Sequence, residues 1–196
     1  GNVADTAQQR FSQAFAEFPF HVGVLYAGPQ NYGPMAPFHL EKTHQQATMI
    51  GFPYDDLDGW RAIYPREVFV RQFARLVSLW QEGLAIMKPY TGQSADFDDM
   101  LCLAEAALCH FASTWNQVRF VMHRDAWQAR RQASDRQALL AIIETEQAIV
   151  LDLIRLRGND ARIGYESSNH YFYTLNDLAE KLLNLKDCAD RLNNSR

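Results

Sequence analysis

Five segments of this chain carry apolar residues at alternating spacings of three and four, and this pattern restricts the fold more than any other feature. Such spacing returns side chains to one face of an α-helix, whereas a half-buried strand alternates with period two. It marks helices over residues 3–18, 65–89, 94–122, 134–158 and 174–192. Short links after residue 65 favour antiparallel neighbours. We therefore expect an all-α fold, an antiparallel bundle of about five helices in a single domain over residues 1–196.

Capping signals mark three of the expected helix starts. Ser94 is a suitable N-cap because an acidic first turn follows it. Ser134 with Gln137, and Thr174 with Asp177, have the three-residue spacing of capping boxes. These residues predict where the last three helices begin.

Residues 19–64 have no helical period although they are rich in Phe, Tyr, Trp, Met and Ile. A connection of that length is unusual in a compact domain, and its aromatic content argues against disorder. We expect it to form a long irregular segment packed on the helical core of residues 65–196. Residues 21–26 suit a short strand that would need a partner outside this chain. A second irregular segment, residues 160–174, could meet the first at one end of the bundle.

Composition and spacing argue against several classes of function. A net charge of −4 and a pI of about 5.8 do not suit nucleic-acid binding, and the apolar runs are too short and interrupted to span a membrane. Cys102, Cys109 and Cys188 form neither a disulfide framework nor a zinc motif. The one Glu-x-x-His sequence, Glu41 to His44, lies outside the helices, so no di-metal site is expected. We expect no metal, no cofactor, no nucleic acid and no membrane partner.

Several ionisable residues leave two interpretations open. Glu105, His110 and Glu146 fall on apolar helix faces, where a carboxylate must pair or take up a proton. They form either internal hydrogen bonds and ion pairs or a catalytic group. A cluster of arginines forms either a solvated helix end or a phosphate site. These arginines are Arg124, Arg130, Arg131 and Arg136.

Two irregular stretches combine carboxylates with aromatic rings, which is the chemistry of sugar recognition. Carboxylates accept hydrogen bonds from hydroxyls, rings stack on a pyranose, and paired carboxylates can hydrolyse glycosides. The alternative is that the aspartates cap turns and the aromatic residues anchor the loop. The candidate substrate-binding residues are Tyr54, Asp55, Asp56, Trp60, Arg61, Glu166, Asn169, His170 and Tyr171. No catalytic residue can be assigned.

Three strings carry a resemblance to a known group of proteins. QNYGP from Gln30, ATMIGFPYDDLDGWRAIYP from Ala47 and RIGYESSNHYFYTLNDLAEKLLN from Arg162 resemble the C-terminal helical region of large bacterial glycoside-hydrolase-like proteins. In those proteins a TIM-barrel domain precedes this region. The resemblance implies that the chain is the tail of a longer, periplasmic or secreted carbohydrate-active protein. It also implies that a barrel partner, absent from this sequence, would supply any catalytic acid or base.

Three functional hypotheses follow. The first is a non-catalytic helical accessory domain of a glycoside-hydrolase-like protein that contributes loop residues to a sugar site. The second is a self-contained hydrolase that uses carboxylate and histidine groups in a pocket at the bundle end. The third is a structural or protein-interaction bundle whose aromatic loops form a docking patch.

Overall fold

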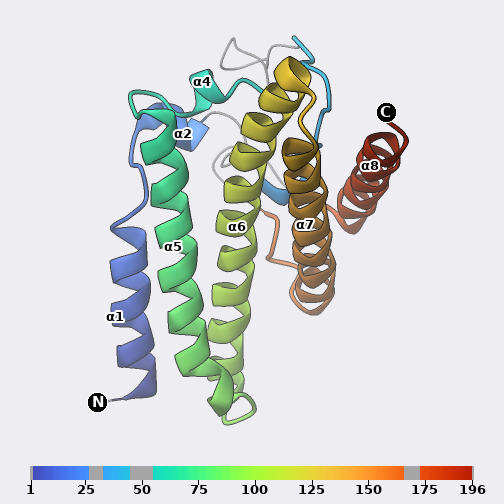
Figure 1. Cartoon of the computed structure of the whole chain (residues 1–196). Helices are drawn as coiled ribbons and strands as arrows, with labels where there is room; N and C mark the ends of the chain where they lie inside the picture. Colours follow the sequence, from blue (N-terminus) through green and yellow to red (C-terminus); the bar gives the residue numbers. More distant parts are fainter. Residues whose placement is uncertain (1, 27–32, 45–54, 166–172, 196) are drawn as a thin grey trace.

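The computed structural model describes residues 2–26, 33–44, 55–165 and 173–195. In these residues the chain forms an all-α bundle without strands, which confirms the expected fold class. The long helices are α1 (Val3–Phe15), α5 (Arg66–Met87), α6 (Ala95–Arg130), α7 (Ala133–Asn159) and α8 (Leu175–Asn194) (Figure 1). The short elements are α2 (Val22–Tyr26), η1 (Gly33–Met35), α4 (Leu57–Trp60) and η2 (Lys88–Tyr90).

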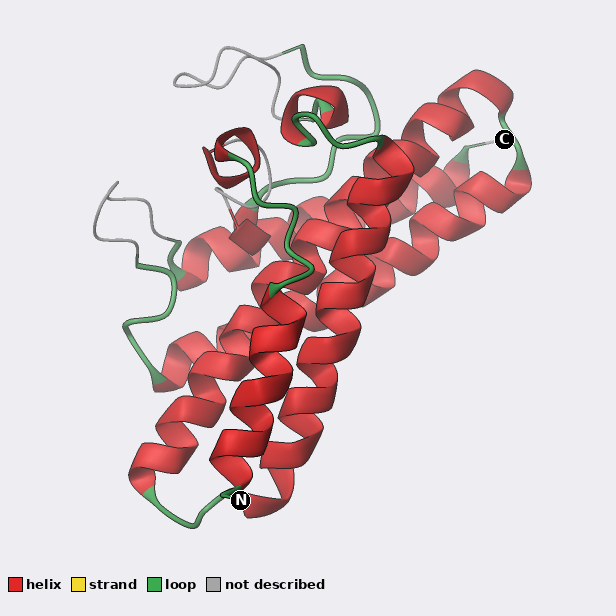
Figure 2. Cartoon of the chain, turned by 90° about the vertical axis from the view of Figure 1, so that its left-hand side faces the viewer, coloured by secondary structure: helices red, strands yellow, loops and turns green. Residues whose placement is uncertain are grey.

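The long helices pack in chain order. The closest pairs are α1 with α5, α5 with α6, α6 with α7, and α7 with α8 (Figures 1 and 2). The 36-residue α6 lies in the middle of this series and extends over roughly 54 Å at 1.5 Å per residue. Among the described residues, no helix is both long enough and apolar enough to cross a membrane.

Two of the three expected helix starts are confirmed. The Ser94 hydroxyl accepts a hydrogen bond from the Phe97 amide at 3.2 Å and caps α6. A reciprocal capping box between Thr174 and Asp177 opens α8. The capping box expected at Ser134 is wrong. In the structure α7 begins at Ala133, because the neighbouring Asp135 binds Arg130 and His123 and holds the α6–α7 turn closed just before Ser134.

The strand suggested for residues 21–26 is also wrong, because Val22–Tyr26 forms the five-residue helix α2. The His21 ring nitrogen Nδ1 accepts from the Gly23 amide at 3.0 Å, and the His21 carbonyl accepts from the Leu25 amide at 3.1 Å. This local capping satisfies the backbone without a partner strand, which explains why apolar alternation misled the prediction.

Gly83 sets the distance between α1 and α5. A Cβ atom at this position would lie 2.3 Å from Cε1 of Phe11, far inside van der Waals contact. The missing side chain therefore lets the Phe11 ring sit directly on the α5 backbone, beside Trp80 at a centroid distance of 4.5 Å. This close approach positions α1 on the bundle.

A segment that begins with η1 and continues without regular secondary structure to residue 43 lies across α6, α7 and α8; we call residues 33–43 the strap. Its backbone is held by side chains of α6 and α8 rather than by a sheet. Asn184 accepts from the Phe38 amide at 2.8 Å and donates to the Phe38 carbonyl at 2.9 Å. Other strap carbonyls accept hydrogen bonds from Gln117, Arg124, Gln128 and Lys181. These contacts fix the path of the chain that leads to the candidate site.

Candidate functional site

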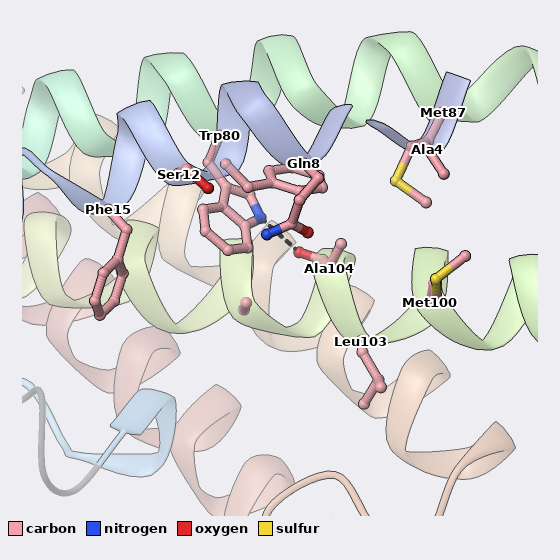
Figure 3. Close-up of a pocket in the computed structure, with 11 residues that line it drawn as sticks. Ala4, Gln8, Ser12, Phe15, Trp80, Met87, Met100, Leu103 and Ala104 are labelled. Carbon is pink, nitrogen blue, oxygen red and sulfur yellow. Dashed lines mark hydrogen bonds between the residues drawn. The ribbon is translucent and has the colours of Figure 1, made fainter. Parts of the chain in front are cut away.

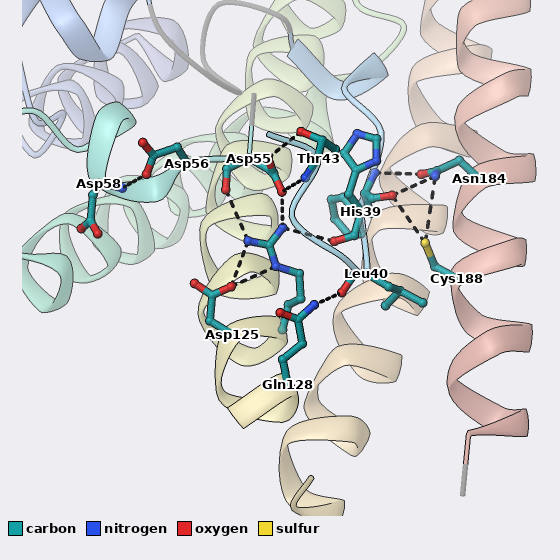
Figure 4. A network of polar contacts seen from close by, with 12 residues as sticks. His39, Leu40, Thr43, Asp55, Asp56, Asp58, Asp125, Gln128, Asn184 and Cys188 are labelled. Carbon is teal, nitrogen blue, oxygen red and sulfur yellow. Dashed lines mark hydrogen bonds and ion pairs between the residues drawn. The ribbon is translucent and has the colours of Figure 1, made fainter. Parts of the chain in front are cut away.

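A buried ion pair joins Arg124 and Asp55, which are 69 positions apart in the chain. Arg124 of α6 is fully buried, and its Nη1 donates to Oδ2 of Asp55 at 2.5 Å. The same carboxylate accepts from the Thr43 amide at 3.3 Å and from the Thr43 hydroxyl at 2.9 Å (Figure 4). Thr43 and Asp55 are thereby fixed to each other and to the bundle.

The remaining donors of Arg124 are also satisfied. Nε and Nη2 donate to Oδ1 of Asp125 at 3.0 and 2.9 Å, and Nη1 donates to the His39 carbonyl at 3.3 Å. Burial of Asp55 favours its neutral form, but the hydrogen bonds from Thr43 and the charge of Arg124 outweigh burial. The pKa of Asp55 is therefore lowered. Asp55 is an ionised structural partner of Arg124.

Two further aspartates organise the neighbouring turn. The Asp56 side chain caps α4 by accepting from the Asp58 amide at 3.1 Å. Asp58 is bound by Arg66 and by Arg61, whose Nε lies 2.8 Å from Oδ1, and these hydrogen bonds lower the pKa of Asp58. Arg61 also donates to the Tyr64 carbonyl at 2.7 Å. These contacts match the alternative interpretation of this segment, in which the aspartates cap turns instead of binding a sugar.

A polar pocket of about 220 Å³ lies beside this turn. Its walls come from the end of the strap, the start of α4, the start of α5 and the C-terminal part of α6. The lining residues are Lys42, His44, Asp55, Asp56, Leu57, Asp58, Arg66 and Asp125. The lining combines four carboxylates with the cationic side chains of Lys42 and Arg66, so the pocket can hydrogen-bond a polyhydroxylated molecule.

The candidate aromatic residue does not line this pocket. Trp60 is 3% exposed and lies in the core with Phe69 and Phe73. A pyranose therefore has no access to the face of the Trp60 ring. Its position matches the loop-anchoring role that the sequence left open.

The other candidate substrate-binding residues are not among the residues that the structure describes. Tyr54, Glu166, Asn169, His170 and Tyr171 fall outside the described residues. Their proposed part in substrate binding stays a prediction.

The described parts of the two irregular segments meet at His110, near the middle of α6 rather than at the end of the bundle where we expected them. His110 Nε2 lies 2.8 Å from the Tyr173 hydroxyl, and a Cβ atom on Gly33 would lie 3.2 Å from the His110 ring. The φ angle of Gly33 is +70°, so this tight contact suits glycine on two grounds. Burial lowers the pKa of His110 to about 4, and the imidazole is neutral at pH 7.

For Glu146, the sequence left open either an internal ion pair with hydrogen bonds or a catalytic role. The structure shows the internal ion pair and hydrogen bonds. It is fully buried and lies 3.5 Å from Lys181 Nζ, while Ser113 and Asn116 donate to its two oxygens at 2.5 and 3.0 Å. Sequence analysis missed Lys181. The available signal was its register, because it lies between Leu178 and Leu185 on the apolar stripe of α8.

The arginine cluster does not form one site. Arg124 binds Asp55, Arg130 binds Asp135 at 3.2 Å, and Arg136 donates to the Ser195 carbonyl at 3.2 Å. The Arg131 guanidinium lies over the Trp127 ring. Across the described residues, no group of three or more His, Cys, Asp or Glu side chains is placed to hold a metal ion.

Comparison with known proteins found no match, either among family models, among curated proteins or among solved structures.

Proposed function

We propose that this chain is a non-catalytic helical accessory domain of a carbohydrate-active, glycoside-hydrolase-like protein, and that the pocket beside α4 contacts a sugar. The observation that carries this proposal is the pocket itself. Asp55 and Asp56, two of the candidates from sequence, line it together with Lys42, His44 and Asp125. Rigid carboxylate and cationic groups around a small cavity suit hydroxyl recognition, because charged groups make the stronger hydrogen bonds.

The charge states in the pocket favour binding over hydrolysis. A glycosidase needs one carboxyl group that stays protonated until it meets the leaving group. Asp55 and Asp58 both have lowered pKa values, because arginines and hydrogen bonds stabilise their charged forms. Neither Asp55 nor Asp58 suits the role of the acid near neutral pH, and both suit the role of a charged hydrogen-bond acceptor.

Titration of the chain with a panel of methyl glycosides, followed by NMR, tests the proposal. We expect saturable shifts of amides around Asp56, and Asp56→Asn should weaken binding by about tenfold, because a charged acceptor is replaced by a neutral one. Asn is an equally good N-cap, so α4 should remain folded. Asp190→Asn on the exposed face of α8 is the matched control. Absence of binding across the panel, or equal binding by both variants, would contradict the sugar site.

A second candidate, a docking role, is favoured by the apolar surface formed by α2 and the turn after α4. Ile63 and Phe20 are 76% and 66% exposed, and Val22 and Tyr26 are exposed beside them. The Tyr64 hydroxyl donates to the Phe20 carbonyl at 3.0 Å and joins the two parts of this surface. In the proposed parent protein, a preceding TIM-barrel domain would pack here.

The docking candidate is tested in a protein that contains both domains. Ile63→Asp should leave this domain folded and loosen its attachment, which limited proteolysis between the domains would report as faster cleavage. Leu183→Asp, on an exposed position of α8, is the control. Unchanged cleavage of the Ile63 variant would rule out this surface.

A further inference from the structure

An apolar groove runs between α1, α5 and α6 (Figure 3), and α1 lies in the half of the bundle away from α4 (Figure 1). Its volume is about 620 Å³, which lies within the usual range for small-molecule sites. The groove follows α1 from Ala4 to Phe15, a length of roughly 16 Å at 1.5 Å per residue. Its shape is therefore that of an elongated molecule.

The floor of the groove offers carbon surface rather than hydrogen bonds. Trp80 Nε1 already donates to the Ala104 carbonyl at 2.8 Å, which leaves only the rings of the indole for a ligand. Phe15, Met100 and Leu103 border the groove and are about half exposed. Burying these side chains under a ligand would remove their apolar surface from water, which favours binding.

The polarity of the lining selects the charge of the ligand. None of the 11 described residues that line the groove is ionisable. A charged ligand would lose its hydration there without a compensating ion pair, which is costly. The polar side chains in the lining are Gln8 and Ser12, both on α1, and neither forms a hydrogen bond with the described part of the protein. They can therefore bind one polar group of a ligand.

We infer that this groove binds a neutral, elongated and mainly apolar small molecule with one hydrogen-bonding group, such as a long-chain alcohol. The aliphatic part lies on Trp80 and the polar group meets Gln8 or Ser12. Met87 and Met100 line the groove near the start of α1, where their flexible thioether side chains adapt to ligands of different length. This site is separate from the proposed sugar pocket.

Two fluorescent probes with the same ring system test the charge selection. N-phenyl-1-naphthylamine is neutral, whereas 8-anilino-1-naphthalenesulfonate carries an added sulfonate. The neutral probe should bind saturably and be displaced by 1-dodecanol. The sulfonated probe should bind about tenfold more weakly, because its charge cannot be compensated in the groove. Equal binding of both probes, or no displacement by dodecanol, would overturn the inference.

A pair of variants locates the site. Leu103→Glu places a carboxylate at the rim and should weaken the neutral probe by about tenfold. Leu151→Glu, at a similarly exposed position on α7, should leave binding unchanged. Light scattering measures the oligomeric state of the wild type and of Leu103→Glu. If the wild-type protein is a dimer that Leu103→Glu dissociates, and the probe does not bind, a second copy of the chain covers the groove and the inference fails.

Discussion

The buried arginine and the buried lysine of this bundle each pair with a carboxylate far away in the sequence. Arg124 meets Asp55, and Lys181 meets Glu146, with all four side chains nearly inaccessible to solvent. The first pair holds the segment before α4 on α6, and the second joins α8 to α7. Since removal of one partner leaves a charge in a low-dielectric site, these residues should be far more sensitive than surface pairs.

Replacement of Arg124 should be among the most damaging single changes. In Arg124→Met, Asp55 keeps its charge but loses its partner, and we expect a loss of about 3–5 kcal/mol in the free energy of unfolding. Urea denaturation measures this loss. Arg130 also pairs with an aspartate, Asp135, but its side chain is largely exposed to solvent. Arg130→Met should therefore lower the free energy of unfolding by less than about 1 kcal/mol.

The double variant Asp55→Asn/Arg124→Met should recover part of the stability, because no uncompensated charge remains. Equal stability of Arg124→Met and Arg130→Met would show that the Arg124–Asp55 pair does not hold the strap and α4 on α6.

His110 makes stability depend on pH in the acidic range. Its pKa is about 4 in the folded protein and 6.5 ordinarily, because burial disfavours the charged ring. Between these values the unfolded chain binds a proton that the folded chain does not. The free energy of unfolding should therefore fall as pH drops from 6.5 towards 4, by up to about 1.4 kcal/mol per pH unit. Below the folded pKa this contribution becomes constant.

Urea denaturation at a series of pH values, for the wild type and His110→Gln, isolates this contribution. The variant should show a shallower decline because the titrating ring is gone, while glutamine can still bond the Tyr173 hydroxyl. Parallel curves for the two proteins would mean that His110 becomes protonated in the folded state without cost.

At the scale of elements, apolar spacing predicted the five long helices well. The start of α6 at Ser94 and the start of α8 at Thr174 followed from local capping chemistry that involves residues three positions apart. The error at Ser134 arose because spacing of three residues takes no account of contacts with more distant residues. Ser134 has a suitable capping partner by spacing, but a long-range contact of Asp135 with His123 decided where α7 begins.

A glycine in α5 controls how α1 packs. Gly83→Ala adds a Cβ where Cε1 of Phe11 lies 2.3 Å away, so the Phe11 ring or α1 must shift, and we expect a loss of about 1–3 kcal/mol in the free energy of unfolding. Gly158→Ala in α7 is the matched control, because nothing lies within 4 Å of its added Cβ. The control should be neutral or more stable by up to about 1 kcal/mol from helix propensity. Thermal denaturation of both variants compares these effects; a stable Gly83 variant would contradict the close packing of α1.

At the scale of the whole molecule, the sequence predicted the bundle but only part of the candidate site. Asp55 and Asp56 do line the pocket, whereas Lys42, Arg66 and Asp125 were not foreseen. These residues are dispersed along the chain and meet only because the strap ends, and α5 begins, beside the C-terminal part of α6. Trp60 illustrates the opposite case, since a ring suited to sugar stacking is buried in the core. Spacing within a segment does not determine which segments meet.

The chain-order packing predicts unequal stability across the molecule. α1 packs mainly on α5 and contributes to the smallest of the three core clusters, whereas α6, α7 and α8 share the largest. Native-state hydrogen exchange should therefore show α1 opening at a lower free energy than α6–α8. Phe11→Ala should accelerate exchange in α1 while leaving the most protected amides of α6 and α7 nearly unchanged. If both regions accelerate equally, α1 unfolds only with the whole bundle, and the molecule behaves as one cooperative unit.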